Sequence, residues 1–186
     1  MRALFACAAL VIASNAVAAV DANHAIESYP IAGNNAAELR AQMNALGPPG
    51  PSGRFDGYTN WNIQWRFNYR RDGGACAIAG VTVDLKTVTK LPEWRNEAAA
   101  PADLRGRWQR YLTALTGHEN GHKENGLSAA QEIERGITAL PPQSNCTAMG
   151  DAANAFGQGI LRKYNQRDLD YDRTTGHGRA QGVAWP

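Results

Sequence analysis

Apolar and polar residues alternate along two neighbouring segments of the chain. In residues 61–70 the aromatic and aliphatic side chains occupy every second position, and the same period returns in residues 79–86. A period of two is typical of strands that bury one face. The sequence Asp-Gly-Gly at 72–74 lies between the segments and is suited to a tight turn. The pattern therefore predicts an antiparallel β-hairpin, which Leu91-Pro92 ends.

Elsewhere the apolar residues recur at steps of three and four, the period of an amphipathic helix. They predict a short helix over residues 34–46, followed by a loop rich in proline and glycine. They also predict a long helix over residues 102–140 and a last helix over residues 148–167. Five glycines weaken the long helix, so a break near Gly126 is the alternative to a continuous helix. From residue 168 to 178 the chain is polar and glycine-rich, which predicts a loop.

These elements predict an α+β fold. The expected arrangement is a short N-terminal helix and an antiparallel hairpin or small sheet, packed on the long helix and on a second, C-terminal helix, as in zincin-like proteins. Residues 20–186 provide the length of one domain with its own core. The segment before Tyr29 is expected to be mobile, which makes His24 a weak candidate for any site.

The first 19 residues have the layout of a secretory signal peptide. Met1-Arg2 precedes an apolar run over residues 3–13, and the small residues Ala16-Val17-Ala18 predict cleavage after Ala18 or Ala19. The apolar run is too short to span a bilayer, and no later segment is apolar enough. The sequence therefore predicts export to the periplasm or the extracellular space.

Charge and cysteine content narrow the function classes. The chain has 19 basic and 17 acidic residues with no block of like charge, so neither a nucleic-acid partner nor a polybasic membrane surface is expected. Cys76 and Cys146 remain after removal of the signal peptide, and an oxidising compartment favours a disulfide between them. Two free thiols or a metal site are the alternatives.

The residues His118-Glu119-Asn120-Gly121-His122 carry the strongest chemical signal. They match the pattern H-E-x-x-H, in which two histidines four residues apart share one helix face and bind one zinc ion. Both histidines continue the apolar stripe of the predicted long helix, so they should point inward. Glu119 is then the general base for a water molecule acidified by Zn²⁺. The alternative is a pair of buried histidines held only by hydrogen bonds.

A hydrolytic zinc site needs a third protein ligand. The metzincin extension of the motif is absent, because Asn125 and Ser128 stand where glycine and histidine are required. His177 in the polar tail is the first choice and Asp172 the second, since neutral imidazole is the commonest metal ligand. The alternative is a surface loop with a solvated histidine. Tyr171 is a candidate for stabilising the oxyanion, with a packing role as its alternative.

The chain resembles a bacterial domain-of-unknown-function family described as predicted secreted zinc-dependent proteases. The resemblance extends over most of the chain after the signal peptide. It implies an exported α+β protease and provides no ligand assignment of its own. It rests on Tyr58-Thr59, Trp61, Trp65, Cys76, Leu91-Pro92, Trp94, His118-Glu119, His122, Cys146, Tyr171-Asp172, Thr175, His177-Gly178 and Gln181-Gly182.

The sequence therefore predicts a secreted or periplasmic zinc metallopeptidase that acts on a peptide or protein substrate. Glu119 activates water and then delivers the proton to the leaving amine. The hairpin strand at the sheet edge is expected to hold an extended peptide by backbone hydrogen bonds. One alternative is a peptidoglycan amide hydrolase with the same zinc site, and another is a non-catalytic, metal-stabilised envelope binding protein. The sequence leaves the substrate and the oligomeric state open.

Overall fold

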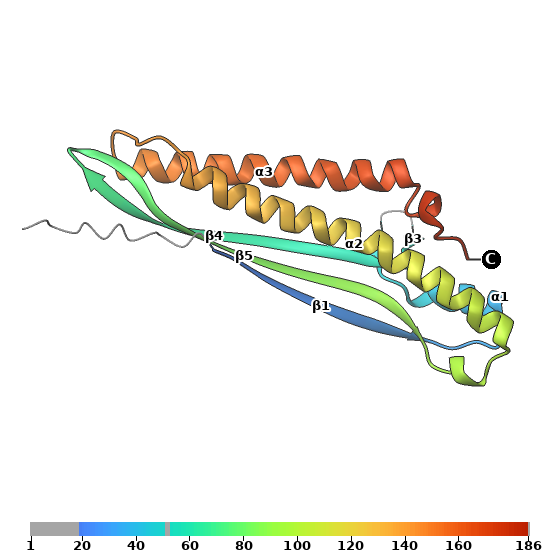
Figure 1. Cartoon of the computed structure of the whole chain (residues 1–186). Helices are drawn as coiled ribbons and strands as arrows, with labels where there is room; N and C mark the ends of the chain where they lie inside the picture. The colour runs from blue at the N-terminus through green and yellow to red at the C-terminus, as the bar shows by residue number, and fades with distance from the viewer. Residues whose placement is uncertain (1–18, 51–52, 186) are drawn as a thin grey trace, which may run out of the picture.

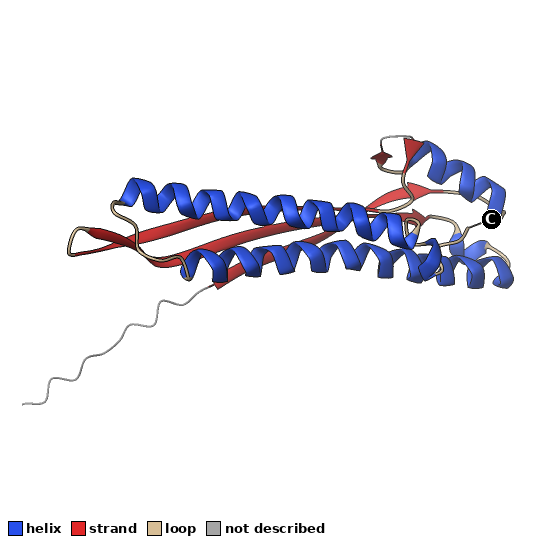
Figure 2. Ribbon diagram, turned by 90° about the horizontal axis from the view of Figure 1, so that it is seen from above, coloured by secondary structure: helices blue, strands red, loops and turns tan. Residues whose placement is uncertain are grey.

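The computed structural model describes residues 19–50 and 53–185, which form a long β-sheet with helices on one face (Figures 1 and 2). The predicted α+β fold is confirmed. Residues 1–18 of the expected signal peptide lie outside the described residues. No described helix is both long and apolar enough to cross a membrane. The elements are β1 (Ala19–Ile31), α1 (Ala36–Leu46), β2 (Pro49–Gly50), β3 (Gly53–Arg54), β4 (Tyr58–Asp72), β5 (Ala75–Trp94), the 3₁₀ turn η1 (Glu97–Ala99), α2 (Ala102–Thr138), α3 (Cys146–Thr175) and the 3₁₀ turn η2 (Arg179–Gln181).

Strands β4 and β5 form the antiparallel hairpin that the alternation predicts. Gly73 and Gly74 make the turn with φ angles of 54° and 94°, a left-handed conformation that glycine adopts without steric cost. On the face toward the helices, Ile63, Val83 and Leu85 are buried. The apolar residues of the period-two pattern thus lie on the face of the sheet that packs against α2 and α3.

Strand β5 continues past Pro92 to Trp94, so the prediction that Leu91-Pro92 ends the hairpin strand is wrong for β5. Pairing with β4 stops at Lys90, whereas pairing with β1 continues to Trp94. Beyond Lys90 the strand therefore has a neighbour on one side only. A residue without a backbone N–H is tolerated at such a place, as it is in edge strands.

The N-terminal segment is a strand, which corrects the expectation of a mobile segment. β1 pairs in parallel with β5 along its whole length and gives the sheet order β1-β5-β4. Residues 21–28 stay exposed, so they lack the buried alternating face that marks the hairpin. Periodicity misses a strand of this kind because it forms by backbone pairing with a distant segment. The Nε2 atom of His24 lies 3.1 Å from the Thr89 hydroxyl, apart from the two histidines of the motif.

Helix α2 is continuous, so the alternative of a break near Gly126 is excluded, and the helix ends at Thr138 rather than at residue 140. Two of its glycines lie at close approaches. A Cβ atom at Gly126 would lie 2.7 Å from Cγ of Trp61 on β4, and one at Gly136 would collide with the Phe156 ring on α3. These glycines weaken the isolated helix but allow the sheet and α3 to pack closely against it.

Helix α3 (Cys146–Thr175) lies beside α2 and extends well beyond the predicted range of 148–167 (Figure 2). In its added turns the face toward α2 carries Asp168 and Asp172 in place of apolar side chains. The amphipathic pattern disappears where these carboxylates replace core residues, and the prediction ended the helix too early for that reason. The helix ends at Gly176, which adopts the left-handed conformation with φ 58°.

Cys76 and Cys146 form a disulfide, as predicted from the sequence. It joins the start of β5 to the start of α3 across a sequence separation of 70 residues. Beside it, the backbone groups of Cys76 and Gln143 exchange two hydrogen bonds of 2.8 Å. Covalent and backbone contacts therefore fix α3 to the sheet at the helix N-terminus.

The buried side chains form two clusters along α2. Ala129 and Ile133 belong to the cluster between the sheet, α2 and α3, whereas Leu104 and Leu115 belong to the cluster that includes α1. The motif residues 118–122 lie on α2 between these two groups. The helix is thus anchored in apolar packing on both sides of the candidate site.

Candidate metal centre

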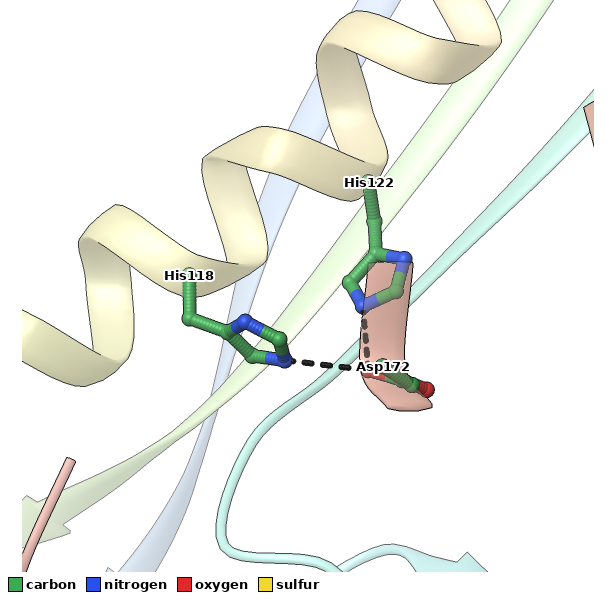
Figure 3. Close-up of side chains that lie close together, drawn as sticks. All are labelled: His118, His122 and Asp172. Carbon is green, nitrogen blue, oxygen red and sulfur yellow. Dashed lines mark hydrogen bonds and ion pairs between the residues drawn. The ribbon is translucent and has the colours of Figure 1, made fainter. Parts of the chain in front are cut away.

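Two histidines on one face of α2 form the centre of the candidate site. His118 and His122 are separated by four residues, so their side chains leave the helix one turn apart. They are 4% and 8% exposed, and their ring centroids are 5.0 Å apart. Both rings point toward the end of α3 (Figure 3).

Asp172 on α3 points between the two rings (Figure 3). Its Oδ1 atom lies 3.1 Å from Nε2 of His118 and 3.0 Å from Nε2 of His122. Two donor atoms that bind a tetrahedral zinc ion at about 2.0–2.1 Å are roughly 3.3 Å apart. Among the described residues, this is the only group of three or more acidic, histidine or cysteine side chains arranged to hold a metal ion. Two imidazole nitrogens and a carboxylate oxygen fit zinc by both chemistry and spacing.

His177 borders this group without joining it, so the structure favours Asp172, the second choice, over His177 as third ligand. The His177 side chain is 63% exposed, and its Nδ1 atom lies 3.5 Å from the outer carboxylate oxygen of Asp172. Its ring packs against Phe55 at a centroid distance of 5.9 Å. The physical reason is the length of α3, which carries Asp172 to the histidines while His177 follows the helix end. With φ 53°, His177 is the only described non-glycine residue with positive φ.

Asp168 lies one turn before Asp172 and orients His122 from behind. Its Oδ1 atom is 3.1 Å from Nδ1 of His122 and accepts a 2.6 Å hydrogen bond from Asn125, while Oδ2 accepts a 2.7 Å bond from the Trp61 indole. A carboxylate on Nδ1 leaves Nε2 as the free ligand atom, an arrangement common around zinc-binding histidines. Sequence reasoning did not single out Asp168. The available signal was its spacing of four residues from Asp172.

Tyr171 is not among the residues that line the cleft beside the two histidines, and its predicted role in stabilising an oxyanion stays a prediction. Its ring stacks on His118, with centroids 5.0 Å apart, and its hydroxyl lies 3.2 Å from the His118 carbonyl oxygen. A Cβ atom at Gly121 would collide with the Tyr171 hydroxyl. The tyrosine thus packs behind the two histidines, and the absence of a side chain at position 121 makes room for it.

Glu119 is 3% exposed, and its side chain extends from α2 toward Gly57, just before β4. Its Oε2 atom is the only buried side-chain nitrogen or oxygen of the described residues without a hydrogen-bond partner. A Cβ atom at Gly57 would lie 2.8 Å from Oε1, so glycine makes room for the carboxylate. Burial raises the pKa of Glu119 above its ordinary value, while the Thr59 hydroxyl and the two histidines act in the opposite direction. The carboxylate therefore has unused capacity to accept a proton.

The charges of the site favour a cation between the ligand atoms. Burial lowers the pKa of His122, but hydrogen bonds to Asp168 and Asp172 outweigh it and raise the pKa to about 10. Burial raises the pKa of Asp172, but hydrogen bonds to His118 and His122 hold that pKa well below its usual range. Both shifts arise because carboxylates and imidazoles are confined together. A divalent cation satisfies the same demand for positive charge.

A cleft of about 880 Å³ opens beside these groups, within the roughly 300–1,000 Å³ range of ligand pockets. Its floor includes His118, Glu119 and His122 of α2. One wall is the start of β4, and the other is the end of α3 with the residues that follow it. The further side chains along it include Arg40, Asn44, Arg54, Phe55, Tyr58, Trp61, Leu169, Arg179 and Trp185.

The fold and the site define an α+β protein with a convergent group of two histidines and one aspartate at the bottom of an open cleft. Residues 26–178 match a family of bacterial proteins of unknown function designated DUF922, and the chain belongs to this family. This result confirms the resemblance found in the sequence at the level of the family. No curated protein and no solved structure matches the chain, so the zincin-like character of the fold stays a prediction.

Proposed function

We propose that this protein is an exported zinc-dependent hydrolase of peptide bonds. The observation that carries the proposal is the convergence of three ligand atoms, from His118, His122 and Asp172, next to the unpaired carboxylate oxygen of Glu119. Three protein ligands are the number found in catalytic zinc sites, whereas structural sites use four. The disulfide supports an oxidising compartment.

Each residue of the candidate site has a separate role in the proposed hydrolysis. His118, His122 and Asp172 would hold the ion through Nε2, Nε2 and Oδ1. A bound Zn²⁺ supplies a Lewis acid, which lowers the pKa of water to about 7 and polarises the scissile carbonyl. The Glu119 carboxylate would accept the proton that water loses during attack and would then transfer this proton to the leaving nitrogen. Burial of Glu119 supports this role, because a carboxylate in an apolar setting binds a proton more readily.

The edge of β4 supports a peptide as the substrate. β4 lies at the edge of the sheet and pairs only with β5 among the described strands. It begins next to the catalytic helix, where the Thr59 hydroxyl donates a 3.3 Å hydrogen bond to the Glu119 carbonyl oxygen. Backbone groups on a free edge hold an extended chain without reading much of its sequence. An extended peptide along β4 would place a peptide bond over the ligand group.

The decisive experiment compares Glu119→Ala with Glu124→Ala, a control at an exposed position on the same helix. Zinc content is measured by metal analysis, and activity is measured on unstructured protein and on purified peptidoglycan. We expect Glu119→Ala to retain one zinc per chain and to lose hydrolysis by at least about 100-fold, the lower end for loss of a general base. The Glu124→Ala protein should match the wild type. Full hydrolysis by Glu119→Ala would exclude the mechanism, and cleavage of peptidoglycan without cleavage of unstructured protein would replace the general peptidase by the alternative, a hydrolase of peptidoglycan amide bonds.

A further inference from the structure

The ring nitrogen of His118 that faces away from Asp172 contacts a side chain from the C-terminal residues. Nδ1 of His118 lies 2.9 Å from Oε1 of Gln181, in the short turn η2. An amide oxygen only accepts hydrogen bonds, so this contact requires the hydrogen to sit on Nδ1. In the neutral ring, Nε2 then has the lone pair that a metal ion held by His118 and Asp172 would need.

The Tyr171 hydroxyl contacts the Gln181 amide and favours one of its two directions, with the amide oxygen 3.3 Å away and the amide nitrogen nearer. The amide nitrogen donates a 2.9 Å hydrogen bond to the Tyr171 hydroxyl oxygen, and the hydroxyl hydrogen is directed to the His118 carbonyl oxygen at 3.2 Å. Three hydrogen bonds thus close a ring through His118, Gln181 and Tyr171. Reversing the amide would put a donor against Nδ1 and move the ring hydrogen to Nε2, where it would block the ligand position.

The backbone after α3 folds back to bring Gln181 to this place. Gly178 and Gly182 adopt φ angles of 81° and 93°, which side chains disfavour. A Cβ atom at Gly178 would lie 3.0 Å from Cγ of His118, so the backbone passes directly against the ligand ring. Val183 then enters the core with 9% exposure. We call residues 176–185 the C-terminal strap.

An aromatic anchor holds the far end of the strap. The Trp185 ring packs edge-on against Trp108 and at a tilt against Tyr111, with centroid distances of 5.5 Å and 5.2 Å. Its indole nitrogen donates a 3.1 Å hydrogen bond to the carbonyl oxygen of Ala36 at the start of α1. Docking of Gln181 therefore depends on packing several residues away from the ligand group.

We propose that Gln181 is a positioning residue for His118 and that the docked C-terminal strap is required for tight metal binding. The inference rests on the proposed metal site and extends it to residues that contact no metal. Such outer partners orient a ligand histidine, and their loss lowers metal affinity by about 10–100-fold. Gln181 contacts Nδ1 of His118 as Asp168 contacts Nδ1 of His122, so each imidazole has a hydrogen-bond acceptor that orients its ring.

The test uses three full-length variants. Gln181→Met removes the acceptor at similar size, Gln181→Glu keeps an acceptor oxygen, and Gln158→Met repeats the first change at an exposed position on α3. Zinc affinity is measured by competition with a chelator. The exchange rate of the His118 Nδ1 proton is measured by NMR on the zinc-loaded protein, and this signal reports orientation of the ring independently of hydrolysis.

We expect Gln181→Met to bind zinc about 10–100-fold more weakly and to lose protection of the Nδ1 proton. Gln181→Glu should stay within a few-fold of the wild type, and Gln158→Met should not differ from it. Equal zinc affinity in Gln181→Met and the wild type would overturn the positioning role and leave the proposed function intact. Equal loss in Gln181→Met and Gln181→Glu would also overturn it. A wild-type chain that binds no zinc would instead overturn the proposed function.

Discussion

At the scale of single residues, two carboxylates one turn apart have different tasks because their neighbours differ. Asp172 contacts Nε2 of both histidines, whereas Asp168 accepts hydrogen bonds from the Asn125 amide and the Trp61 indole and contacts Nδ1 of His122. Every partner of Asp168 is able to donate a hydrogen. Its oxygens are therefore engaged in orienting a ligand, which leaves Asp172 as the carboxylate available for a cation.

This division of tasks predicts opposite results for two substitutions in the same segment. Asp172→Ala should weaken zinc binding by more than the roughly 100-fold upper limit for loss of an outer partner, since it removes a ligand atom. His177→Ala should keep zinc affinity within a few-fold, because the His177 side chain is largely exposed and, of the three proposed ligands, approaches only the outer oxygen of Asp172. Chelator competition measures both affinities. The reverse order would reinstate His177 as the third ligand.

At the scale of elements, the glycines of α2 differ in how closely other parts of the protein approach them. Gly126 lies against Trp61 of β4. Gly117 is exposed, and apart from the backbone of its own helix and its chain neighbours no described atom would lie within 4 Å of a Cβ atom there. The helix therefore carries glycine both where it is required and where nothing in its packing explains it. A sequence alone does not distinguish the two cases.

Alanine at these two positions should change stability in opposite directions. Gly126→Ala should destabilise the protein by about 1–3 kcal/mol, because the new methyl group forces the Trp61 side chain and β4 away from α2. Gly117→Ala should stabilise it by up to about 1 kcal/mol through helix propensity. Urea unfolding followed by circular dichroism gives both values. Equal destabilisation by the two substitutions would contradict the packing described for Gly117.

The elements also show what the sequence was able to predict. The hairpin and α2 were found because their buried faces carry a regular apolar period, and the motif residues were found because their spacing matches a helix turn. β1 was missed because most of its residues are exposed on both faces. The end of α3 and the preference for Asp172 were missed together, since polar site residues replace the apolar stripe there. The polar side chains of the candidate site thus removed the apolar pattern by which the last turns of α3 would have been predicted.

At the scale of the whole molecule, the disulfide and the candidate centre lie far apart along α3. The Cys76–Cys146 bond fixes the start of this helix, and the proposed ligand Asp172 lies 26 residues beyond Cys146. At 1.5 Å per residue this separation is about 39 Å. The two features therefore lie toward opposite ends of α3, which runs along much of the elongated molecule (Figure 1).

Removing the disulfide should lower global stability without changing metal affinity. The double substitution Cys76→Ser with Cys146→Ser should reduce the free energy of unfolding by about 2–5 kcal/mol, because it releases a long loop in the unfolded chain. Sites this far apart usually contribute independently. Denaturant unfolding and chelator titration of the same preparation check both statements. A tenfold change in zinc affinity would show that the helix transmits disorder along its length.

The matching repeat of histidines on α2 and aspartates on α3 has a consequence for how the two helices align. His118 and His122 are four residues apart, and so are Asp168 and Asp172. Sliding α3 by four residues, about 6 Å, would bring Asp168 close to the place of Asp172 and nearly preserve the helical periodicity. The imidazoles alone therefore do not set the axial register. By holding Asp168, Trp61 and Asn125 favour the observed alignment of the two helices over the shifted one.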